Sequence, residues 1–252
     1  MVLERRSFKG NSRQSNPLLP AGERRVIVAA MNSEDQMSTR PLLIFAVGLL
    51  LIGTSSPLLA QQNPMSFFVT SVGLGNGGNL GGLSGADRHC QSLATAVGAG
   101  SKTWHAYLST QGAGGVNAKD RIGGGPWFNA KGVQVAANVA ELHGDKNNIN
   151  KQTALDEKGA VVNGRGDTPN QHDMLTGTQH DGTVVPGSED ATCGNWTNSA
   201  DGQGSAVVGH HDLIGNTNGP NFWNYSHKTP GCAQANLQRV GGGGLLYCFA
   251  IN

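Results

Sequence analysis

The chain has 252 residues, with 18 Lys and Arg against 17 Asp and Glu and a formal net charge of +1. This near balance holds after residue 60 as well, and it excludes the basic class of proteins that bind nucleic acid or anionic membranes through charge. The 38 glycines, together with abundant Asn, Ser and Thr, predict a domain of short strands and long ordered loops.

The N-terminal region has the pattern of an export signal. Residues 42–52 are almost continuously apolar, Arg40 precedes them, and small residues lead to Ala60. This pattern predicts a secretory signal peptide over residues 37–60, cleaved after Ala60, and a mature protein that is secreted or periplasmic. The run is shorter than the ~20 residues of a membrane span, so we expect no stable membrane insertion after cleavage, and an uncleaved anchor is the alternative. The Arg-rich residues 1–36 are either a disordered extension or a misassigned start.

The segment that follows combines the signals of a helix and a strand. Ser84 is a suitable N-cap, and Asp87 can reach back to the free amides of a helix that starts near Gly85. Residues 104–108 alternate as a half-buried strand does. The apolar helix residues recur at spacings of three and four and include a cysteine on the inner face: Ala86, Cys90, Leu93, Ala94 and Val97.

All four cysteines lie after the apolar N-terminal run, which favours disulfides formed in an oxidising compartment. Three connectivities are open to four cysteines. The apolar residues 244–251 predict a central closing strand, and the helix that carries Cys90 is the layer expected to pack on it. Packing therefore favours Cys90 with Cys248, which leaves Cys193 with Cys232.

Residues 141–181 are rich in Asp, Asn, His and Thr and predict a long polar loop, with a hairpin turn at Asn163-Gly164. Such a loop is either functional or uses its side chains to satisfy its own backbone. Several His-Asp groups offer metal ligands, but their irregular spacing favours surface or hydrogen-bonding roles. These groups are His172-Asp173, His180-Asp181 and His210-His211-Asp212.

Several stretches resemble the endostatin-like domain of collagen, a variant of the C-type lectin-like fold. They include the helix around Cys90, the strand at Thr103–Ser109 and the segment Cys193–Thr197. Shorter matches are Asp120-Arg121-Ile122, Trp127-Phe128-Asn129, Leu175-Thr176-Gly177 and Asp181-Gly182. The resemblance implies one α+β domain over residues 61–252, with mixed short antiparallel strands, one or two helices and long ordered loops. It also implies the same nested cysteine pairing.

A resemblance to sugar-binding C-type lectins indicates where a ligand would bind. In that family an acid-or-amide, Pro, Asn triplet and a Trp-Asn-Asp triplet hold calcium and sugar hydroxyls. Here Thr168-Pro169-Asn170 and Trp223-Asn224-Tyr225 occupy the corresponding places, and Ser188-Glu189-Asp190 precedes a cysteine. The resemblance implies calcium as the candidate cofactor, although Thr168 and Tyr225 remove oxygen ligands that calcium prefers. The predicted calcium ligands are Asn170, Glu189 and Asn224.

The sequence contains no catalytic constellation such as Gly-x-Ser-x-Gly or His-Glu-x-x-His, and every cysteine is expected to be oxidised. We therefore expect a non-enzymatic module that binds a carbohydrate or cell-surface glycan, since aromatic rings beside amides and hydroxyls suit a sugar. The alternatives are binding or adhesion to an extracellular protein without sugar, and an unrecognised extracytoplasmic hydrolase. The predicted carbohydrate-binding residues are Asp167, Asn170, Asp173, Trp223, Asn224 and Tyr225.

Overall fold

The computed structural model describes residues 64–215, 219 and 221–252. The predicted signal peptide over residues 37–60 and the segment 1–36 lie outside the described residues. Within the described ranges, no helix is long and apolar enough to span a membrane. The described chain is a mixed α+β structure with few helices, short and mainly antiparallel strands, and two disulfides. These features confirm the predicted α+β class, with short and mainly antiparallel strands, and the two predicted disulfides.

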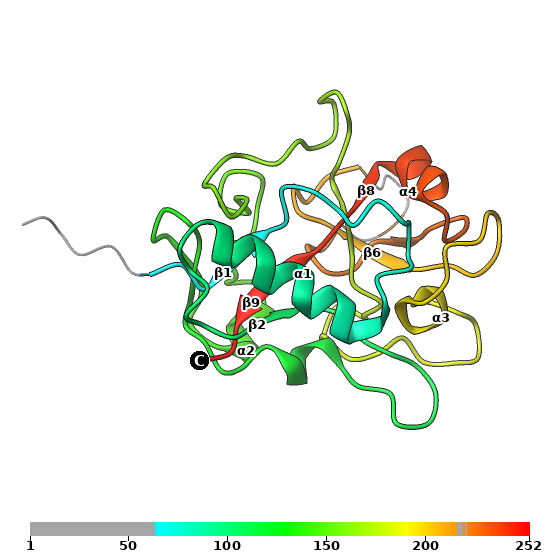
Figure 1. Ribbon diagram of the computed structural model, residues 1–252, viewed down its shortest axis with the longest axis horizontal. Coiled ribbons are helices and arrows are strands. Elements are labelled where there is room, and N and C mark those ends of the chain that lie inside the picture. Colours follow the sequence, from blue (N-terminus) through cyan, green and yellow to red (C-terminus); the bar gives the residue numbers. More distant parts are fainter. Residues whose placement is uncertain (1–63, 216–218, 220) are drawn as a thin grey trace, which may run out of the picture. The chain divides into compact units, whose positions relative to one another are not determined.

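The first sheet is built around β9 (Tyr247–Ala250), whose four residues are buried. It pairs antiparallel with β1 (Phe67–Val69) on one side and with β2 (Trp104–Ala106) on the other (Figure 1). The prediction of a central closing strand is confirmed. The apolar run 244–251 is nevertheless divided, because β8 (Gly242–Leu245) ends before β9 begins and belongs to a different sheet.

The helix α1 (Gly82–Ala96) lies across the first sheet and starts two residues earlier than Ser84 (Figure 1). Its N-cap is Gly81, whose φ of 74° lies in the left-handed region, so the predicted cap at Ser84 is wrong. Asp87 forms an ion pair with Arg121 at 2.7 Å and accepts a hydrogen bond from the backbone of β2. Its carboxylate therefore ties the helix to the sheet instead of capping it.

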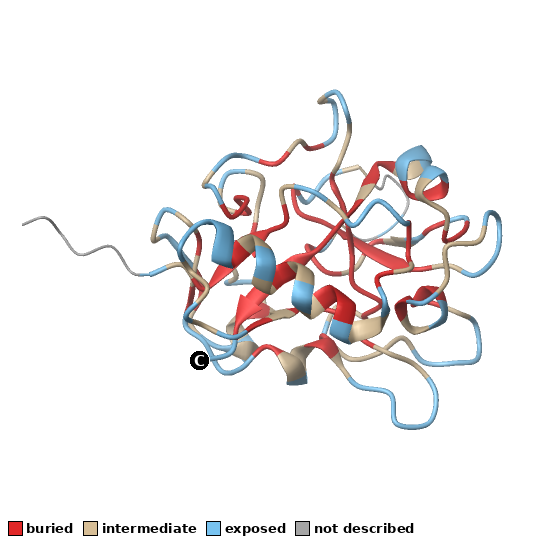
Figure 2. Cartoon of the chain, in the orientation of Figure 1, coloured by how far each residue is buried: buried red, intermediate tan, exposed pale blue. Residues whose placement is uncertain are grey.

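The buried face of α1 follows the predicted helical spacing. Ala86, Cys90 and Ala94 are fully buried, whereas Val97, just beyond the helix, is 37% exposed. Figure 2 shows the buried residues of α1 and of the central strand as red ribbon, with exposed residues on the outer side of the helix. Cys90 therefore points into the core, as the periodicity predicts.

Both predicted disulfides are present. Cys90 is bonded to Cys248 across 158 residues of chain, and Cys193 is bonded to Cys232 across 39 residues. The first joins α1 to β9, and the second begins in the short helix α3 (Cys193–Trp196). Each closes a loop, which in the chain-entropy description stabilises the fold by about 4 to 5 kcal/mol.

The second sheet has the strand order β7-β6-β5-β8. Within it, β5 (Asp173–Leu175) pairs antiparallel with β6 (Val207–His210) and parallel with β8. The short strand β7 (His227–Lys228) lies at the edge beside β6. The helix α4 (Gln234–Val240) ends at Gly241 and leads directly into β8, against which it packs.

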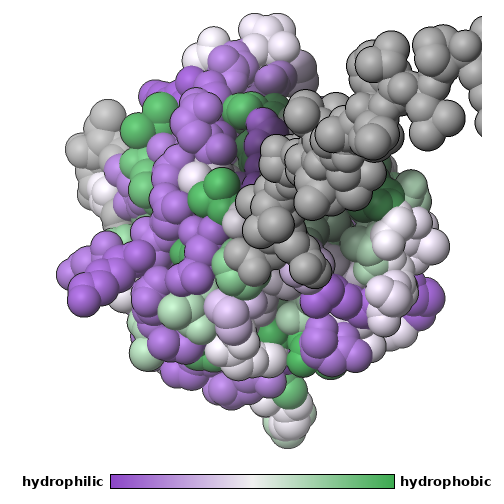
Figure 3. All heavy atoms as spheres, turned by 90° about the vertical axis from the view of Figure 1, so that its left-hand side faces the viewer, coloured by the Kyte–Doolittle hydropathy of each residue, from purple (hydrophilic) through white to green (hydrophobic). Residues whose placement is uncertain are grey.

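The remaining elements are short. They are the 3-10 helix η1 (Ala118–Arg121), the strand pair β3 (Trp127–Phe128) and β4 (Gln134–Ala136), and the helix α2 (Val139–Leu142). On the face shown in Figure 3, hydrophobic residues are dispersed among hydrophilic ones outside the part that grey atoms cover.

The long polar loop is present, but without the predicted hairpin. Residues 143–172 form neither helix nor strand, and neither Asn163 nor Gly164 has the positive φ of a tight hairpin turn. The Gly164 N–H donates instead to Asp167 Oδ2, at 2.7 Å. The side chain of Asp167 therefore shapes this turn, which sequence spacing does not reveal.

Candidate functional site

The second sheet brings histidine and aspartate side chains to one point. In the β5–β6 register Asp173 lies opposite His210, and β7 places His227 opposite Val208. Because side chains alternate along a strand, these positions share one face of the sheet. His172 precedes β5, and its ring stacks on that of His210 with centroids 4.1 Å apart. We call His172, Asp173, His210 and His227 the His-Asp cluster.

Asp173 is the centre of the His-Asp cluster, and its side chain is only 1% exposed. The Nε2 atoms of His172 and His210 each lie 3.1 Å from Asp173 Oδ1, and His227 Nε2 lies 3.6 Å from Oδ2. These contacts are close but are not aligned as hydrogen bonds, since both carboxylate oxygens and the His210 Nε2 lack a hydrogen-bond partner. A buried carboxylate in this condition carries a large desolvation cost unless a cation or proton compensates it.

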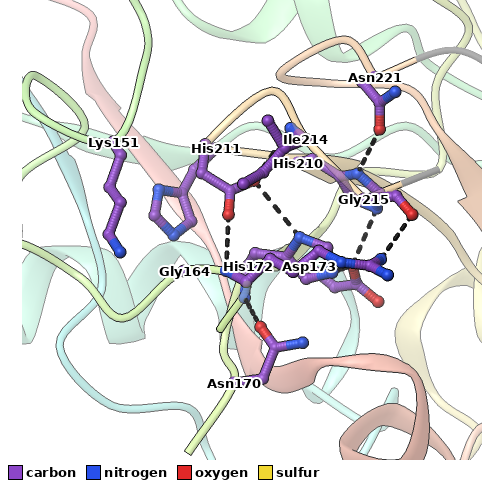
Figure 4. A network of polar contacts seen from close by, with 12 residues as sticks. Lys151, Gly164, Asn170, His172, Asp173, His210, His211, Ile214, Gly215 and Asn221 are labelled. Carbon is purple, nitrogen blue, oxygen red and sulfur yellow. Dashed lines mark hydrogen bonds and ion pairs between the residues drawn. The ribbon is translucent and has the colours of Figure 1, made fainter. Parts of the chain in front are cut away.

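The outer nitrogens of the three imidazoles all have oxygen partners. The contacts are His172 Nδ1 to Asp212 Oδ1 at 3.3 Å, His210 Nδ1 to Asn221 Oδ1 at 3.1 Å, and His227 Nδ1 to the Lys228 carbonyl oxygen at 3.2 Å. Figure 4 shows part of this network, with Asn221 and Asn170 contacting it from opposite sides. A neutral imidazole that donates from Nδ1 keeps a lone pair on Nε2. When Nδ1 donates in this way, the Nε2 lone pairs of His172 and His210 face the Asp173 carboxylate.

The ring of His172 is held by closely packed glycine backbone. A Cβ atom added at Gly241 would lie 2.9 Å from His172 Nε2, and one at Gly215 would lie 2.7 Å from His172 Cε1. Both glycines also have φ in the left-handed region, 108° and 114°, which only glycine adopts without strain. A larger residue at either position would displace the ring.

At the His-Asp cluster, burial and the neighbouring side chains shift pKa values in opposite directions. Burial raises the pKa of Asp173, but the imidazoles of His210 and His227 outweigh this effect and the pKa is lowered. The Asp173 carboxylate raises the pKa of His227 against the effect of burial. Burial also raises the pKa of Asp212, but His172 and backbone N–H groups outweigh it and leave this pKa lowered. Both carboxylates are therefore ionised at neutral pH.

The donor types in the cluster are those that transition metals prefer, imidazole nitrogen and carboxylate oxygen. The donor atoms of His172, Asp173 and His210 all lie within 4.8 Å of one another. The irregular sequence spacing of these residues predicts separate surface or hydrogen-bonding roles. In the structure they are buried and lie next to one another. The sequence does not show this arrangement, because it depends on the pairing of β5 with β6.

Two predicted sugar-binding residues lie in the core. Trp223 is 1% exposed and donates a hydrogen bond from Nε1 to the Leu142 carbonyl oxygen at 3.0 Å. Asn224 is fully buried, and its Nδ2 donates to the Tyr107 hydroxyl at 2.9 Å and to the His180 carbonyl oxygen. Both side chains are therefore committed to holding the loop, and direct contact with a sugar would require the loop to open. The polar sequence around them conceals this burial.

The other predicted sugar-binding residues do not form one surface with Trp223 and Asn224. Asp167 is half-buried and paired with Lys151 at 2.6 Å. Asn170 and Tyr225 are half-buried on different loops, and Asp173 belongs to the buried His-Asp cluster.

The three predicted calcium ligands have separate partners. Asn170 Oδ1 accepts from the His172 N–H, and the exposed Glu189 pairs with Lys228 at 2.7 Å. Asn224 lies in the core. Within the described part of the chain, no hydrogen bond or ion pair joins any two of these three side chains.

A surface pocket instead forms beside Phe222, which is 39% exposed and stacks on His180 with ring centroids 3.6 Å apart. The pocket has a volume of about 200 Å³. We call it the Phe222 pocket, and its polar walls include Asp145, Asn147 and Asn221. Backbone hydrogen bonds between Phe222 and Tyr225 close a bend here, in which Trp223 and Asn224 are buried and Phe222 stays exposed.

Asn221 connects the Phe222 pocket with the His-Asp cluster, since it lines the pocket and contacts His210 Nδ1. A larger hollow of about 460 Å³ lies elsewhere, between Gln111 and Asp190. The Asp190 carboxylate there already accepts hydrogen bonds from the backbone of Thr192 and Gly194. A third pocket, of about 240 Å³, is lined by Trp127 and Phe128, but Trp127 is only 1% exposed and Phe128 is half-buried. The Phe222 pocket differs in that its aromatic ring is exposed and lies near a carboxylate, that of Asp145.

A comparison with protein-family models finds no match, and a comparison with curated proteins finds none. The functional argument therefore rests on the chemistry of these two sites, because a fold class alone does not specify a function.

Proposed function

We propose that this protein is an exported, non-enzymatic binding module of the C-type lectin-like, endostatin-like class, and that it recognises a carbohydrate of a cell-surface or matrix glycan. Two nested disulfides and the mixed α+β architecture support this class. Disulfides persist in oxidising compartments, which supports a secreted or periplasmic location.

The observation that carries the proposal is the exposed ring of Phe222 at a small polar pocket. The C–H face of a sugar packs on an aromatic ring, while amides and carboxylates bond its hydroxyls. The exposed Asp145 supplies a carboxylate at this pocket, whereas the Asn147 amide is engaged by the backbone of Gly144 and Ile149. The pocket is smaller than the ~300 Å³ at which typical small-molecule sites begin, so it suits a single terminal sugar ring.

Recognition at the Phe222 pocket is proposed to be independent of calcium. Asp145 is the one carboxylate among its lining residues, and calcium prefers a shell of several carboxylate and carbonyl oxygens. The separate partners of Asn170 and Glu189 and the full burial of Asn224 support the same view.

A glycan array probed with the full chain, with and without a calcium chelator, tests the proposal. We expect binding that survives chelation and that Phe222→Ala lowers at least tenfold. Val133→Ala is the matched control, because Val133 is similarly exposed at 42% but lies in the β3–β4 turn. Absence of glycan binding both with and without the chelator would overturn the proposal. Equal losses of glycan affinity in Phe222→Ala and Val133→Ala would show that the glycan binds elsewhere on the protein.

Binding to an extracellular protein without sugar is the second candidate. Leu213 and Ile214 are 40% and 49% exposed, and Leu213 lines the same pocket as Phe222. Exposed apolar side chains of this kind are common at protein interfaces. A silent glycan array, followed by a captured extracellular protein that Phe222→Ala releases, would favour this candidate.

A further inference from the structure

The His-Asp cluster has a role that glycan binding does not explain. We propose that His172, Asp173 and His210 bind a divalent transition metal, most suitably zinc, and that His227, which lies outside this group of mutually close donor atoms, moves in as the fourth ligand. The site is distinct from the Phe222 pocket, and its function is to stabilise the second sheet.

The first argument is the arrangement of lone pairs. Imidazole Nε2 atoms at 3.1 Å from a carboxylate oxygen repel it when both partners are acceptors. Asp173 has no hydrogen bond to compensate its burial, and His210 Nε2 has none either. A cation between them would convert this repulsion into coordination.

The second argument is donor chemistry and spacing. Zinc takes imidazole nitrogens and carboxylate oxygens at about 2.0–2.2 Å, which places neighbouring ligand atoms of a tetrahedron roughly 3.3 Å apart. The two separations from Asp173 Oδ1, both 3.1 Å, are close to that value. Nitrogen-rich sites favour zinc, copper or nickel over calcium and magnesium, which prefer oxygen.

The third argument is the outer set of contacts. Metal-binding histidines usually donate their other ring N–H to a carboxylate or carbonyl oxygen, which fixes the ring and raises its basicity. Here Asp212 fills that role for His172, and the Lys228 carbonyl oxygen fills it for His227. The donors are therefore oriented before any metal arrives.

The surroundings favour a stabilising rather than a catalytic metal. The side chains of Asp173 and His210 are each 1% exposed, which leaves no open position for a substrate. His227 is 30% exposed and provides the route by which an ion reaches the site. Because Asp173, His210 and His227 come from three neighbouring strands, one ion would link β5, β6 and β7.

The test uses the full chain, stripped with a chelator and then titrated with zinc and with cobalt, whose absorption spectrum reports tetrahedral nitrogen and oxygen ligands. We expect one zinc per chain, a rise in thermal stability on loading, and a cobalt spectrum of a four-coordinate site. Failure of the stripped wild-type chain to take up one equivalent of either ion would overturn the proposal, and would show that the cluster is an ion-pair network with a protonated imidazole. This result does not depend on any variant.

Variants then assign the ligands. His210→Gln should weaken zinc binding at least a hundredfold, whereas the neighbouring His211→Gln should not change it. His211 is a stringent control because it is fully buried and adjacent, yet its Nε2 contacts the Asn163 carbonyl oxygen outside the cluster. Asp212→Asn should weaken binding about 10- to 100-fold by loosening His172. Unchanged affinity in a folded His210→Gln variant, checked by near-ultraviolet circular dichroism, would refute the assignment.

Discussion

The two sheets of this protein are held together in different ways. The first, β1-β9-β2, is covered by α1 and linked to it through the Cys90–Cys248 disulfide, and its strands bury aromatic side chains. The second, β7-β6-β5-β8, buries Asp173 and two histidines where its strands meet. Apolar burial and a disulfide stabilise the first sheet whether or not an ion is bound. A buried charged cluster, in contrast, contributes stability only when its charges are paired. The second sheet should therefore respond far more strongly to metal than the first.

The largest effect on the first sheet should come from removing its covalent link. The double variant Cys90→Ala with Cys248→Ala should lose about 5 kcal/mol of unfolding free energy, and Cys193→Ala with Cys232→Ala about 4 kcal/mol, because the first loop is longer. Urea denaturation measures both. If the Cys90–Cys248 double variant loses less unfolding free energy than the Cys193–Cys232 double variant, the first sheet is stabilised by packing and not by its disulfide.

The next largest effect should come from the second sheet. Asp173→Ala should lower the unfolding free energy of the zinc-loaded chain by about 3 kcal/mol relative to the zinc-loaded wild type, because it removes the carboxylate that joins the imidazoles of His172 and His210 around the ion. The same variant should gain no stability from zinc, whereas the wild-type chain should. Thermal melts with and without zinc measure both effects, and a zinc-induced shift that persists in Asp173→Ala would contradict the proposed ligand set.

A smaller change should act on the side chains of His172 and Asn170. Gly241→Ala should cost about 2 kcal/mol more than Gly166→Ala and should weaken zinc binding. Both glycines have left-handed φ, 108° and 91°, so backbone strain largely cancels in the comparison. A Cβ atom would meet the His172 ring at Gly241 but nothing within 4 Å at Gly166. Equal melting temperatures for the two variants would show that the ring moves aside freely.

The smallest effect should be a pH dependence at His143. Burial lowers the pKa of His143, whose Nδ1 contacts the Val139 carbonyl oxygen and whose Nε2 lies 2.7 Å from the Tyr107 hydroxyl. The unfolded chain therefore takes up a proton more readily, near pH 6.5, and stability falls as the pH drops below that value. His143→Gln should flatten this part of the curve between about pH 7 and pH 5. His89→Gln, on α1, should leave it unchanged.

The first sheet could be predicted largely from sequence. The helical spacing around Cys90 and the apolar run at residues 244–251 each predict a buried segment. In the structure both segments are buried, and the Cys90–Cys248 disulfide joins them. The predicted N-cap at Ser84 is wrong, because the helix begins at Gly82, and Asp87 pairs with Arg121, far along the chain, instead of reaching back to the free amides. Local signals thus identified the elements but not the side-chain contacts between them.

The sites were harder to predict. The residues of the His-Asp cluster come from three strands, and only strand register brings Asp173 opposite His210. The adjacent pair His172-Asp173 was a visible signal, but the sequence does not show which other segment would meet it. Trp223 and Asn224 were expected at the ligand because their neighbours are polar, and composition does not distinguish a buried polar loop from an exposed one.

The central place of β9 has a consequence for how the chain matures. A protein that emerges N-terminus first presents Cys90 and Cys193 together before Cys232 and Cys248 follow, and β1 and β2 have no strand between them until β9 arrives. The earliest pair of thiols is therefore a non-native one. Efficient maturation requires either that Cys90 stays reduced until the last strand appears or that thiol–disulfide exchange later corrects the bond.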